Sequence, residues 1–284
     1  MRIYIAAPLF NEAERAFNEH IDSILRECGH ETFLPQREGG CVADLPDVIE
    51  GMEKRKYLFQ LDCAHMDWCD TVLFLFDGRV PDEGACFELG YCYAKGKRCI
   101  GYKTDARSFI DGFDNVMLHS APEVVLRNEE ELRIFFLKEN PAVRKEKSCG
   151  AVVYRQGSEG LEFLLEHMVK GHISIPKGHV EGDETEEETA MREIREETNL
   201  EVELDTAFRH VITYSPGESI VKDVVFFIAE AKPGQMINQE CEVTSLEWLP
   251  FEQAVKALTH ASDRETLKAA NEYLKRRMNH GWQV

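Results

Sequence analysis

The sequence lacks any hydrophobic run that approaches the ~20 apolar residues of a membrane-spanning helix, and its first residues do not form a secretory signal. It has neither a GxxxxGK(S/T) phosphate loop nor a GxGxxG cofactor loop, which disfavours ATPase and dehydrogenase functions. Basic residues are scarce: 33 lysines and arginines stand against 52 acidic residues, a formal net charge of −19. A nucleic-acid polymer is therefore not expected as a partner, because it requires a basic surface.

The nine cysteines do not form a disulfide framework, since their number is odd and their spacing is irregular. We therefore expect reduced thiols in a cytoplasmic protein. Cys63, His65 and Cys69 lie close together in the sequence, but no paired CxxC accompanies them. We interpret them as small buried helix residues and not as a zinc site.

The 284 residues suit two domains, and the first half alternates short apolar segments with amphipathic ones. This alternation is typical of a doubly wound α/β domain with a parallel, flavodoxin- or Rossmann-like sheet. We expect strands at 2–7, 32–34, 71–76, 98–102 and 115–118, and helices at 12–28, 47–66, 85–95 and 129–137. The charged, proline-containing segment 138–147 is predicted to link domains at 1–140 and 148–284.

Ligands of doubly wound folds bind beyond the carboxyl ends of the strands, so polar residues near the strand ends are site candidates. Tyr4 lies on the first strand, and Asp70 and Asp77 flank the central one. Asp82 and Glu88 follow, six residues apart, in a loop and the next helix. Two carboxylates can divide glycosyl transfer between attack on the anomeric carbon and control of the leaving group's proton. An acidic helix start favoured by the helix dipole is the alternative.

Four segments, MRIYIAAPLF, CDTVLFLFDG, PDEGACFELGYCYAKGK and FDNVMLH, together resemble the nucleoside 2-deoxyribosyltransferases over roughly residues 1–125. The resemblance implies that Glu88 is the nucleophile and that Asp82 helps to bind the substrate. It implies that Asp70 contacts the base or its proton and that Tyr4 positions the nucleophile. It also implies that Asn115 reaches a neighbouring subunit's site, and hence a homo-oligomer formed through the N-terminal domain.

The implied chemistry is a double displacement that passes through a covalent deoxyribosyl ester, and the acceptor is either another base or water. Related families in this fold hydrolyse nucleoside 5′-monophosphates and would need a phosphate-binding serine or a basic group near the first loop. The first loop, APLFNEAER, offers only Arg15 as a nearby cation, which favours nucleosides.

The most acidic stretch of the chain, GHVEGDETEEETAMREIREETNL at 178–200, places Glu193, Glu196 and Glu197 on one helical face. Converging like charges raise each other's pKa, and a hard divalent cation such as Mg²⁺ or Mn²⁺ relieves that repulsion. A solvated acidic helix face is the alternative. The spacing of Gly178, Glu184 and the REIREE run resembles the Nudix box of the Nudix hydrolases. The box departs from the family at Asn199, where a glycine is usual; asparagine tolerates the left-handed conformation that ends the helix.

The flanking segments SCGAVVYR, SIPKGHVEGDE and EVTSLEWL resemble the diadenosine tetraphosphate hydrolase branch over about residues 148–276, which implies a Nudix fold with helices flanking a mixed sheet. A metal ion and catalytic water are then expected at Glu193, Glu196 and Glu197. Glu184 is expected to bind a second metal or to orient the first ligands. The remaining candidates are Lys177 and Lys222 for phosphate binding, Arg192 at the carboxylates and substrate, Glu240 or preferably Glu242 as base, and His179 as a loop residue.

The sequence thus predicts a bifunctional enzyme that acts on nucleosides and on nucleoside polyphosphates. Alternatively, one half is a nucleotide-sensing regulatory module, or the first half is a nucleoside 5′-monophosphate N-glycosidase. The intact glutamate trio argues against a purely sensing Nudix domain, because a sensor need not keep a metal cluster.

Overall fold

The computed structural model of the protein describes residues 1–40, 45–78, 80–107, 114–158, 160–217, 219–239 and 241–280. The chain divides into two compact units, Met1–Val143 and Arg144–Val284.

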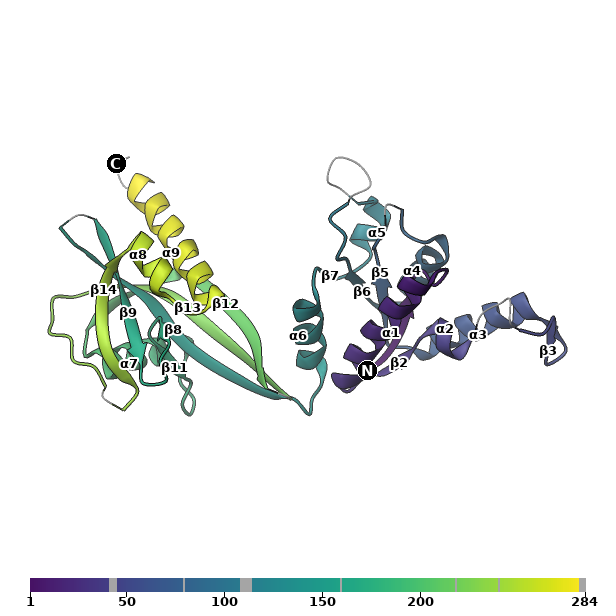
Figure 1. Ribbon diagram of the computed structural model, residues 1–284, viewed down its shortest axis with the longest axis horizontal. Helices are drawn as coiled ribbons and strands as arrows, with labels where there is room; N and C mark the ends of the chain where they lie inside the picture. Colours follow the sequence, from purple (N-terminus) through teal and green to yellow (C-terminus); the bar gives the residue numbers. More distant parts are fainter. Residues whose placement is uncertain are drawn as a thin grey trace. The chain divides into compact units, whose positions relative to one another are not determined.

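The first unit is built on a parallel five-stranded sheet in the order β2-β1-β5-β6-β7 (Figure 1). The strands are β1 (Arg2–Ala6), β2 (Glu31–Phe33), β5 (Thr71–Leu75), β6 (Arg98–Tyr102) and β7 (Val124–Leu126). The predicted doubly wound fold is therefore confirmed. The strand order reverses between β1 and β5, which is where folds of this kind bind their ligands.

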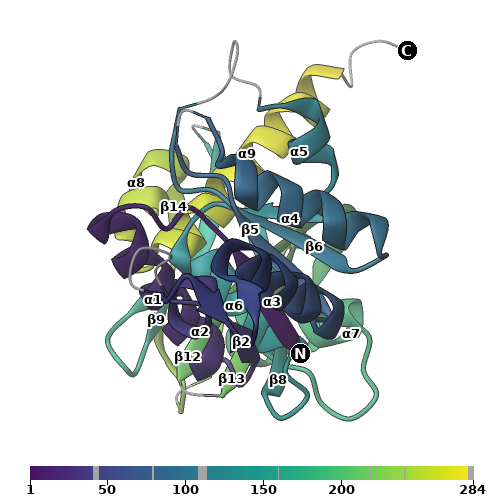
Figure 2. The ribbon, with the colours of Figure 1, turned by 90° about the vertical axis from the view of Figure 1, so that its right-hand side faces the viewer.

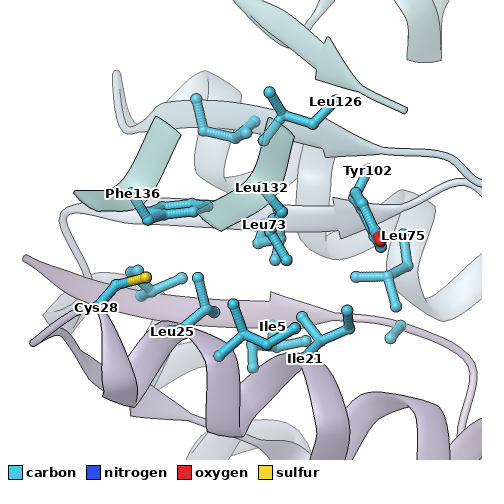
Figure 3. Close-up of a cluster of buried hydrophobic side chains, with 14 of the residues drawn as sticks. Ile5, Ile21, Leu25, Cys28, Leu73, Leu75, Tyr102, Leu126, Leu132 and Phe136 are labelled. Carbon is cyan, nitrogen blue, oxygen red and sulfur yellow. The ribbon is translucent and has the colours of Figure 1, made fainter. Parts of the chain in front are cut away.

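Side chains of β1 and β5 alternate between the two faces of this sheet, and each face is covered by helices. Ile3 and Ile5 point toward α1 (Glu12–Glu27) and α6 (Glu129–Glu139), whose core contacts are drawn in Figure 3. Tyr4 and Ala6 point toward α3 (Lys54–Trp68) and α4 (Glu83–Ala94), which lie side by side in Figure 2. The Tyr4 side chain is therefore directed at the α3–α4 face.

Two element predictions in the first unit are wrong. The helix expected at 47–66 begins only at Lys54, because Glu50 and Gly51 adopt positive φ and turn the chain between β3 (Val48–Ile49) and β4 (Met52–Glu53). A short α2 (Pro35–Glu38) precedes this hairpin.

The segment 115–118, predicted as the fifth strand, opens the helix α5 (Val116–Ser120) instead. The Asn115 side chain caps this helix by accepting a hydrogen bond from the Met117 N–H at 2.9 Å. The fifth strand is β7, which follows the helix.

The predicted linker at 138–147 is mostly regular structure. Helix α6 continues to Glu139 and strand β8 (Arg144–Gln156) begins at Arg144. The first residues of β8 pair with β13 in a parallel ladder, Arg144 with Ile220 and Lys145 with Val221. This pairing explains why a polar, charged segment is extended.

The second unit contains a mixed seven-stranded sheet in which β10-β9-β8-β13-β12 follow one another, while β11 pairs with β8 and β14 with β9. Within this second sheet, β8–β13 is the only parallel pair among the described residues. The strands after β8 are β9 (Leu161–Met168), β10 (Ile173–Ser174), β11 (Lys177–His179), β12 (Val202–Gly217), β13 (Ile220–Ala231) and β14 (Val243–Pro250). Strand β12 is a single long strand, with a register shift between Asp205 and His210 in its pairing with β13.

Helices cover both faces of this mixed sheet, as the Nudix resemblance implies. Ala190 and Ile194 of α7 (Glu186–Thr198) pack on one face with Leu164 of β9. Helices α8 (Phe251–Ala257) and α9 (Ala261–His280) cover the other (Figure 1). Gly150 of β8 lets β11 approach closely, because a Cβ there would lie 2.0 Å from the Pro176 carbonyl oxygen. This close approach fixes the Lys177 backbone beside α7.

Candidate functional sites

A carboxyl and a phenol meet inside the first unit. The Tyr4 hydroxyl donates a hydrogen bond to Glu88 Oε1 at 2.8 Å, which joins β1 to α4. Burial raises the pKa of Glu88 to about 8, the Tyr4 hydrogen bond opposes that rise, and the charges of Asp62 and Asp82 add to it. Tyr4 is fully buried, so the hydrogen bond holds Glu88 in one place. The structure therefore joins two of the predicted site residues directly.

Asp62 on α3 is a site residue that sequence reasoning missed. Burial raises its pKa to about 6, and its charge raises the pKa values of both Glu88 and Tyr4. The ionised form of one carboxyl therefore disfavours ionisation of the other, and the two groups hold about one proton between them near neutral pH. A signal was present in the sequence: Asp62 is an acidic residue within the core-facing stretch of a helix that precedes the central strand.

Asp70, predicted to contact the base or its proton, is placed elsewhere. It lies at the amino end of β5, where Arg2 donates to its two carboxylate oxygens from Nη2 at 2.6 Å and from Nε at 3.2 Å. Its charge does not contribute to the pKa shift of Glu88, whereas the charge of Asp62 does. The geometry therefore gives no support to the role predicted for Asp70, and Asp62 is the acidic residue of α3 whose charge acts on Glu88.

The other predicted residues of the first unit hold the backbone. Asp77 accepts hydrogen bonds from the Thr104 N–H, the Thr104 hydroxyl and the Asp105 N–H at 2.6–2.8 Å, so it fastens two strand ends and is not free for substrate. Asp82 caps α4 through the Ala85 N–H at 2.8 Å while its charge reaches Glu88. Asn115 caps α5, and its contact with a neighbouring subunit stays a prediction.

The acidic helix α7 forms as its sequence predicts. Thr185 and Glu188 make a reciprocal capping box at its start. At its end Asn199 adopts the left-handed conformation with φ 59° and ψ 17°, so the expected helix-ending turn is present although the family's glycine is not.

Arg192 organises the acidic side chains of α7. Its Nε and Nη2 donate to the two oxygens of Glu184 at 2.7 and 2.9 Å, and its Nη1 donates to Glu193 at 2.8 Å and to Glu196 at 3.2 Å. Nη2 also donates to the His179 carbonyl oxygen. Every nitrogen of this guanidinium is thus engaged within the protein. We therefore correct the assignment of Arg192 to substrate binding: it positions the carboxylates.

Glu184, predicted as a metal ligand, is bound to Arg192 instead. Both of its oxygens accept from the guanidinium, and Oε2 also accepts from the Thr189 hydroxyl at 2.9 Å. The Arg192 hydrogen bonds lower its pKa to about 2. Its geometry fits the alternative role, orientation of the first ligands.

The inner carboxylates of α7 are enclosed. Glu197 is buried, and its Oε2 accepts from the Lys177 N–H at 3.0 Å. Burial raises its pKa to about 7. Burial also raises the pKa of Glu193, as do the charges of Glu196 and Glu242. Gly178 makes room for Glu193, since a Cβ at Gly178 would lie 1.9–2.1 Å from the Glu193 carboxyl group.

The donor set suits a divalent cation, although no three His, Cys, Asp or Glu side chains of the described ranges are preformed as a metal-binding group. Carboxylate oxygens are the ligands that Mg²⁺ and Mn²⁺ prefer. Burial raises the pKa values of Glu193 and Glu197 although Arg192 and Lys177 lie near them, so a divalent cation would stabilise their ionised forms further. The close packing at Gly178 supports the same assignment, because the absence of a side chain there lets the Glu193 carboxylate lie directly against the backbone.

A basic cluster lies near these carboxylates, made of Lys170, His172, Lys177, Lys222 and His260. Burial lowers the pKa of Lys222, and the charges of Lys177 and Lys170 lower it further. The rings of His172 and His260 lie 5.7 Å apart. Burial raises the pKa of Asp263, and the charges of Lys177 and of both histidines oppose that rise. An anion entering this cluster would relieve the repulsion among its members.

The remaining candidates of the second unit lie at its edge. Glu242 is exposed, and its charge raises the pKa of Glu193. Glu240 lies outside the described residues. His179 is exposed and contacts Lys222 Nζ at 3.1 Å; it ends strand β11, paired with Ser148, and is not the loop residue that was predicted. Nowhere in the described ranges is a helix both long and apolar enough to span a membrane.

Replacing Glu184 with Gln should make the second unit less stable at pH 6 and almost equally stable near pH 2. A carboxyl with a depressed folded pKa stabilises above its unfolded value of about 4.3, and that stability disappears as pH falls toward the folded value of about 2. Urea unfolding between pH 6 and pH 3, with the exposed Glu201→Gln as control, measures the difference. A gap between wild type and Glu184→Gln that stays constant with pH would contradict the ion pair.

Comparisons with known proteins match each half of the chain to a different family. The sequence model described as nucleoside 2-deoxyribosyltransferase matches residues 3–129, and that of the NUDIX domain matches residues 144–270. The asymmetrical bis(5′-nucleosyl)-tetraphosphatase of Mus musculus is 31% identical over 140 residues, which cover 45% of this chain and 95% of that protein.

Two solved structures are also similar. A C. elegans Ap4A hydrolase binary complex is 26% identical with a TM-score of 0.43, over 46% of this chain and 98% of that one. A 2-deoxyribosyltransferase from Bacillus psychrosaccharolyticus is 26% identical with a TM-score of 0.39, over 47% of this chain and 90% of that one. The two sequence models and the tetraphosphatase relative show a two-domain protein of nucleotide metabolism, whose C-terminal half belongs to the Nudix family and whose N-terminal half matches the nucleoside 2-deoxyribosyltransferase model.

Proposed function

We propose that the protein is a bifunctional enzyme. Its N-terminal half cleaves or exchanges the N-glycosidic bond of a 2′-deoxynucleoside, and its C-terminal half hydrolyses a nucleoside polyphosphate of the diadenosine tetraphosphate class. The observation that carries the first activity is the pair of partly buried carboxyls, Glu88 and Asp62, with the Tyr4 hydroxyl bound to Glu88. The one that carries the second is the carboxylate-lined α7 beside a basic cluster.

In the N-terminal half, Glu88 attacks C1′ of the deoxynucleoside as the glycosidic C1′–N bond breaks. The electron pair of that bond leaves with the base, and Asp62 supplies the proton that the base nitrogen takes up. The pair holds about one proton near neutral pH, and in the free protein that proton lies on Glu88, whose pKa is the higher. The mechanism therefore requires the proton to pass to Asp62 before Glu88 attacks, so that one carboxyl acts as an acid while the other is ionised. The hydrogen bond from Tyr4 favours the ionised, nucleophilic form of Glu88.

The second step reverses the first. A new base, or a water molecule, attacks C1′ of the Glu88 ester, gives up its proton to Asp62, and the ester C1′–O bond breaks. Two inversions give overall retention at C1′. The same residues therefore serve transfer and hydrolysis, and access of water to the ester decides between them.

The first loop favours a nucleoside over a nucleoside 5′-monophosphate. Arg15, the cation nearest that loop in sequence, donates from Nη1 to the Leu9 carbonyl oxygen at 3.1 Å. Asn18 donates to the Pro8 carbonyl oxygen at 2.8 Å. These groups stabilise the loop and are occupied, so they do not supply a phosphate site.

Replacing Asp62 with Asn should lower kcat/KM for base release from a deoxynucleoside by at least ~10²-fold, because general acid catalysis is lost. A deoxynucleoside with an N7-methylated purine, whose base leaves without protonation, should be cleaved by this variant at close to the wild-type rate. Chromatographic assay of released base measures both.

Asp70→Asn is the matched control and should change either rate less than ~3-fold, since its carboxylate serves Arg2. An equal loss on both substrates in Asp62→Asn, or a larger loss in Asp70→Asn, would contradict the assignment of the acid.

In the C-terminal half, Glu193, Glu196 and Glu197 would hold Mg²⁺ or Mn²⁺. When bound, the metal would neutralise phosphate charge and lower the pKa of a coordinated water. The basic cluster binds the phosphate oxygens. Its positive charges attract an anionic substrate locally, although the whole chain carries a net charge of −19. Glu242, at the edge of the carboxylates, is the proposed base for the attacking water. A phosphoanhydride P–O bond breaks and two nucleotides are released.

The two activities should separate by single substitutions. Glu197→Gln should lower hydrolysis of diadenosine tetraphosphate by at least ~10²-fold with Mg²⁺ present, since a buried metal ligand is lost, and should leave base release unchanged. Glu88→Ala should lower base release by at least ~10³-fold and leave polyphosphate hydrolysis unchanged. Both reactions are followed on the full chain by product chromatography.

Either activity surviving its own substitution would contradict the corresponding site. Base release without any polyphosphate turnover by the wild type would favour the alternative in which the Nudix half senses a nucleotide. We also propose a homo-oligomer formed through the N-terminal half, with Asn115 reaching the neighbour's site.

A further inference from the structure

Strand β9 carries a buried carboxylate without a donor. Glu166 is 1% exposed, and among the described residues neither of its oxygens has a hydrogen-bond partner. A buried ionisable group normally pairs with an opposite charge or with hydrogen-bond donors, because burial without them is costly. Such a group requires a partner that the protein chain itself does not provide.

The sheet directs Glu166 at α7. Leu164, two residues earlier on the same strand, packs against Ala190 and Ile194 of α7. Side chains two apart on a strand share a face, so Glu166 points to the same side. Pairing of Glu166 with Ser174 on one side and Leu246 on the other fixes its backbone in the middle of the sheet.

The groups around Glu166 are those of the proposed metal site. Glu197 lies beside it, and the charge of Glu193 also reaches it. Two facing carboxyl groups either share a proton, which lets one donate to the other, or bind a cation between them when both are ionised. Lys177 is near, but its ammonium donates to the Ser174 hydroxyl at 3.2 Å, and within the described ranges it forms no ion pair with Glu166.

We propose that Glu166 is a further ligand of the divalent cation, bound from the sheet side while Glu197 binds it from the helix side. This inference rests on the proposed metal-dependent function of the C-terminal half. It adds to the α7 trio a ligand from a different element, so that the ion ties β9 to α7. The cation would then lie deeper than the half-exposed Glu196 alone would place it.

The test is a Mn²⁺ titration of the full-length protein followed by electron paramagnetic resonance of free Mn²⁺. Glu166→Gln keeps the shape of the side chain and should weaken Mn²⁺ binding at least ~10-fold. Glu247→Gln, on the neighbouring strand β14 and paired with His167, removes the same charge outside the site and should bind as the wild type does. Equal affinity in wild type and Glu166→Gln would overturn the proposal.

Thermal unfolding separates a ligand from a merely buried carboxyl. Without metal, Glu166→Gln should unfold at the wild-type temperature or above it, because an unpaired acidic group is removed. Saturating Mn²⁺ should raise the unfolding temperature of the wild type and of Glu247→Gln, and raise that of Glu166→Gln distinctly less. An equal metal-dependent increase in all three would overturn the proposal.

Wild-type crystals soaked in Mn²⁺ give a test without any variant. An anomalous peak within about 2.6 Å of a Glu166 oxygen is expected. A peak held by Glu193, Glu196 and Glu197 with Glu166 beyond contact distance would overturn the inference and leave the proposed function intact. A wild type that binds no Mn²⁺ would overturn both.

Discussion

Repulsion between carboxylates that share a buried space is the constraint on which both halves of this protein depend. Glu88 and Asp62 are enclosed together under the first sheet, and Glu197, Glu193 and Glu166 are enclosed together over the second. A chain selected for stability alone would replace such groups with apolar residues, because burying like charges is unfavourable. Each cluster therefore indicates a partner or a reaction that the isolated chain lacks.

The two halves relieve this repulsion differently. In the first, a proton shared between two carboxyls and a hydrogen bond from Tyr4 are sufficient, and the shared proton is what a leaving base needs. In the second, Arg192 pairs with Glu184 and Glu193, while the buried Glu197 accepts a hydrogen bond from the Lys177 backbone N–H and its pKa is raised by burial. The first arrangement suits acid catalysis at a glycosidic bond, and the second suits a divalent ion with a polyphosphate.

Much of the fold could be predicted from the sequence because local and tertiary signals agree. Asn11 caps α1, Thr185 and Glu188 cap α7, and Asn199 ends α7 where asparagine tolerates a positive φ. The prediction at 115–118 failed because a short apolar run does not distinguish a strand from one helical turn, and the cap of Asn115 decides the outcome.

The sites were predictable where a motif fixes spacing and not where contacts come from distant segments. Glu88 and Tyr4 meet as expected, whereas Asp70 was chosen for its place beside the central strand and is held by Arg2. Neither Asp62 nor Glu166 belongs to a run of acidic residues. The only local signal for Asp62 is its place in the core-facing stretch of a helix, and Glu166 stands out only once the strands and helices are assembled. Burial, which the local sequence does not report, is what separates them from surface carboxylates.

The central claim is tested most directly by the titration of individual carboxyl groups in the full-length protein. Carbon-13 NMR of carboxyl-labelled protein, with Glu88→Gln and Asp62→Asn used to assign the signals, gives their midpoints. The structure predicts a midpoint near 8 for Glu88 and near 6 for Asp62. Midpoints near the ordinary values of about 4 for both groups would contradict the account, because the two carboxyls would then be neither buried nor close enough to share a proton.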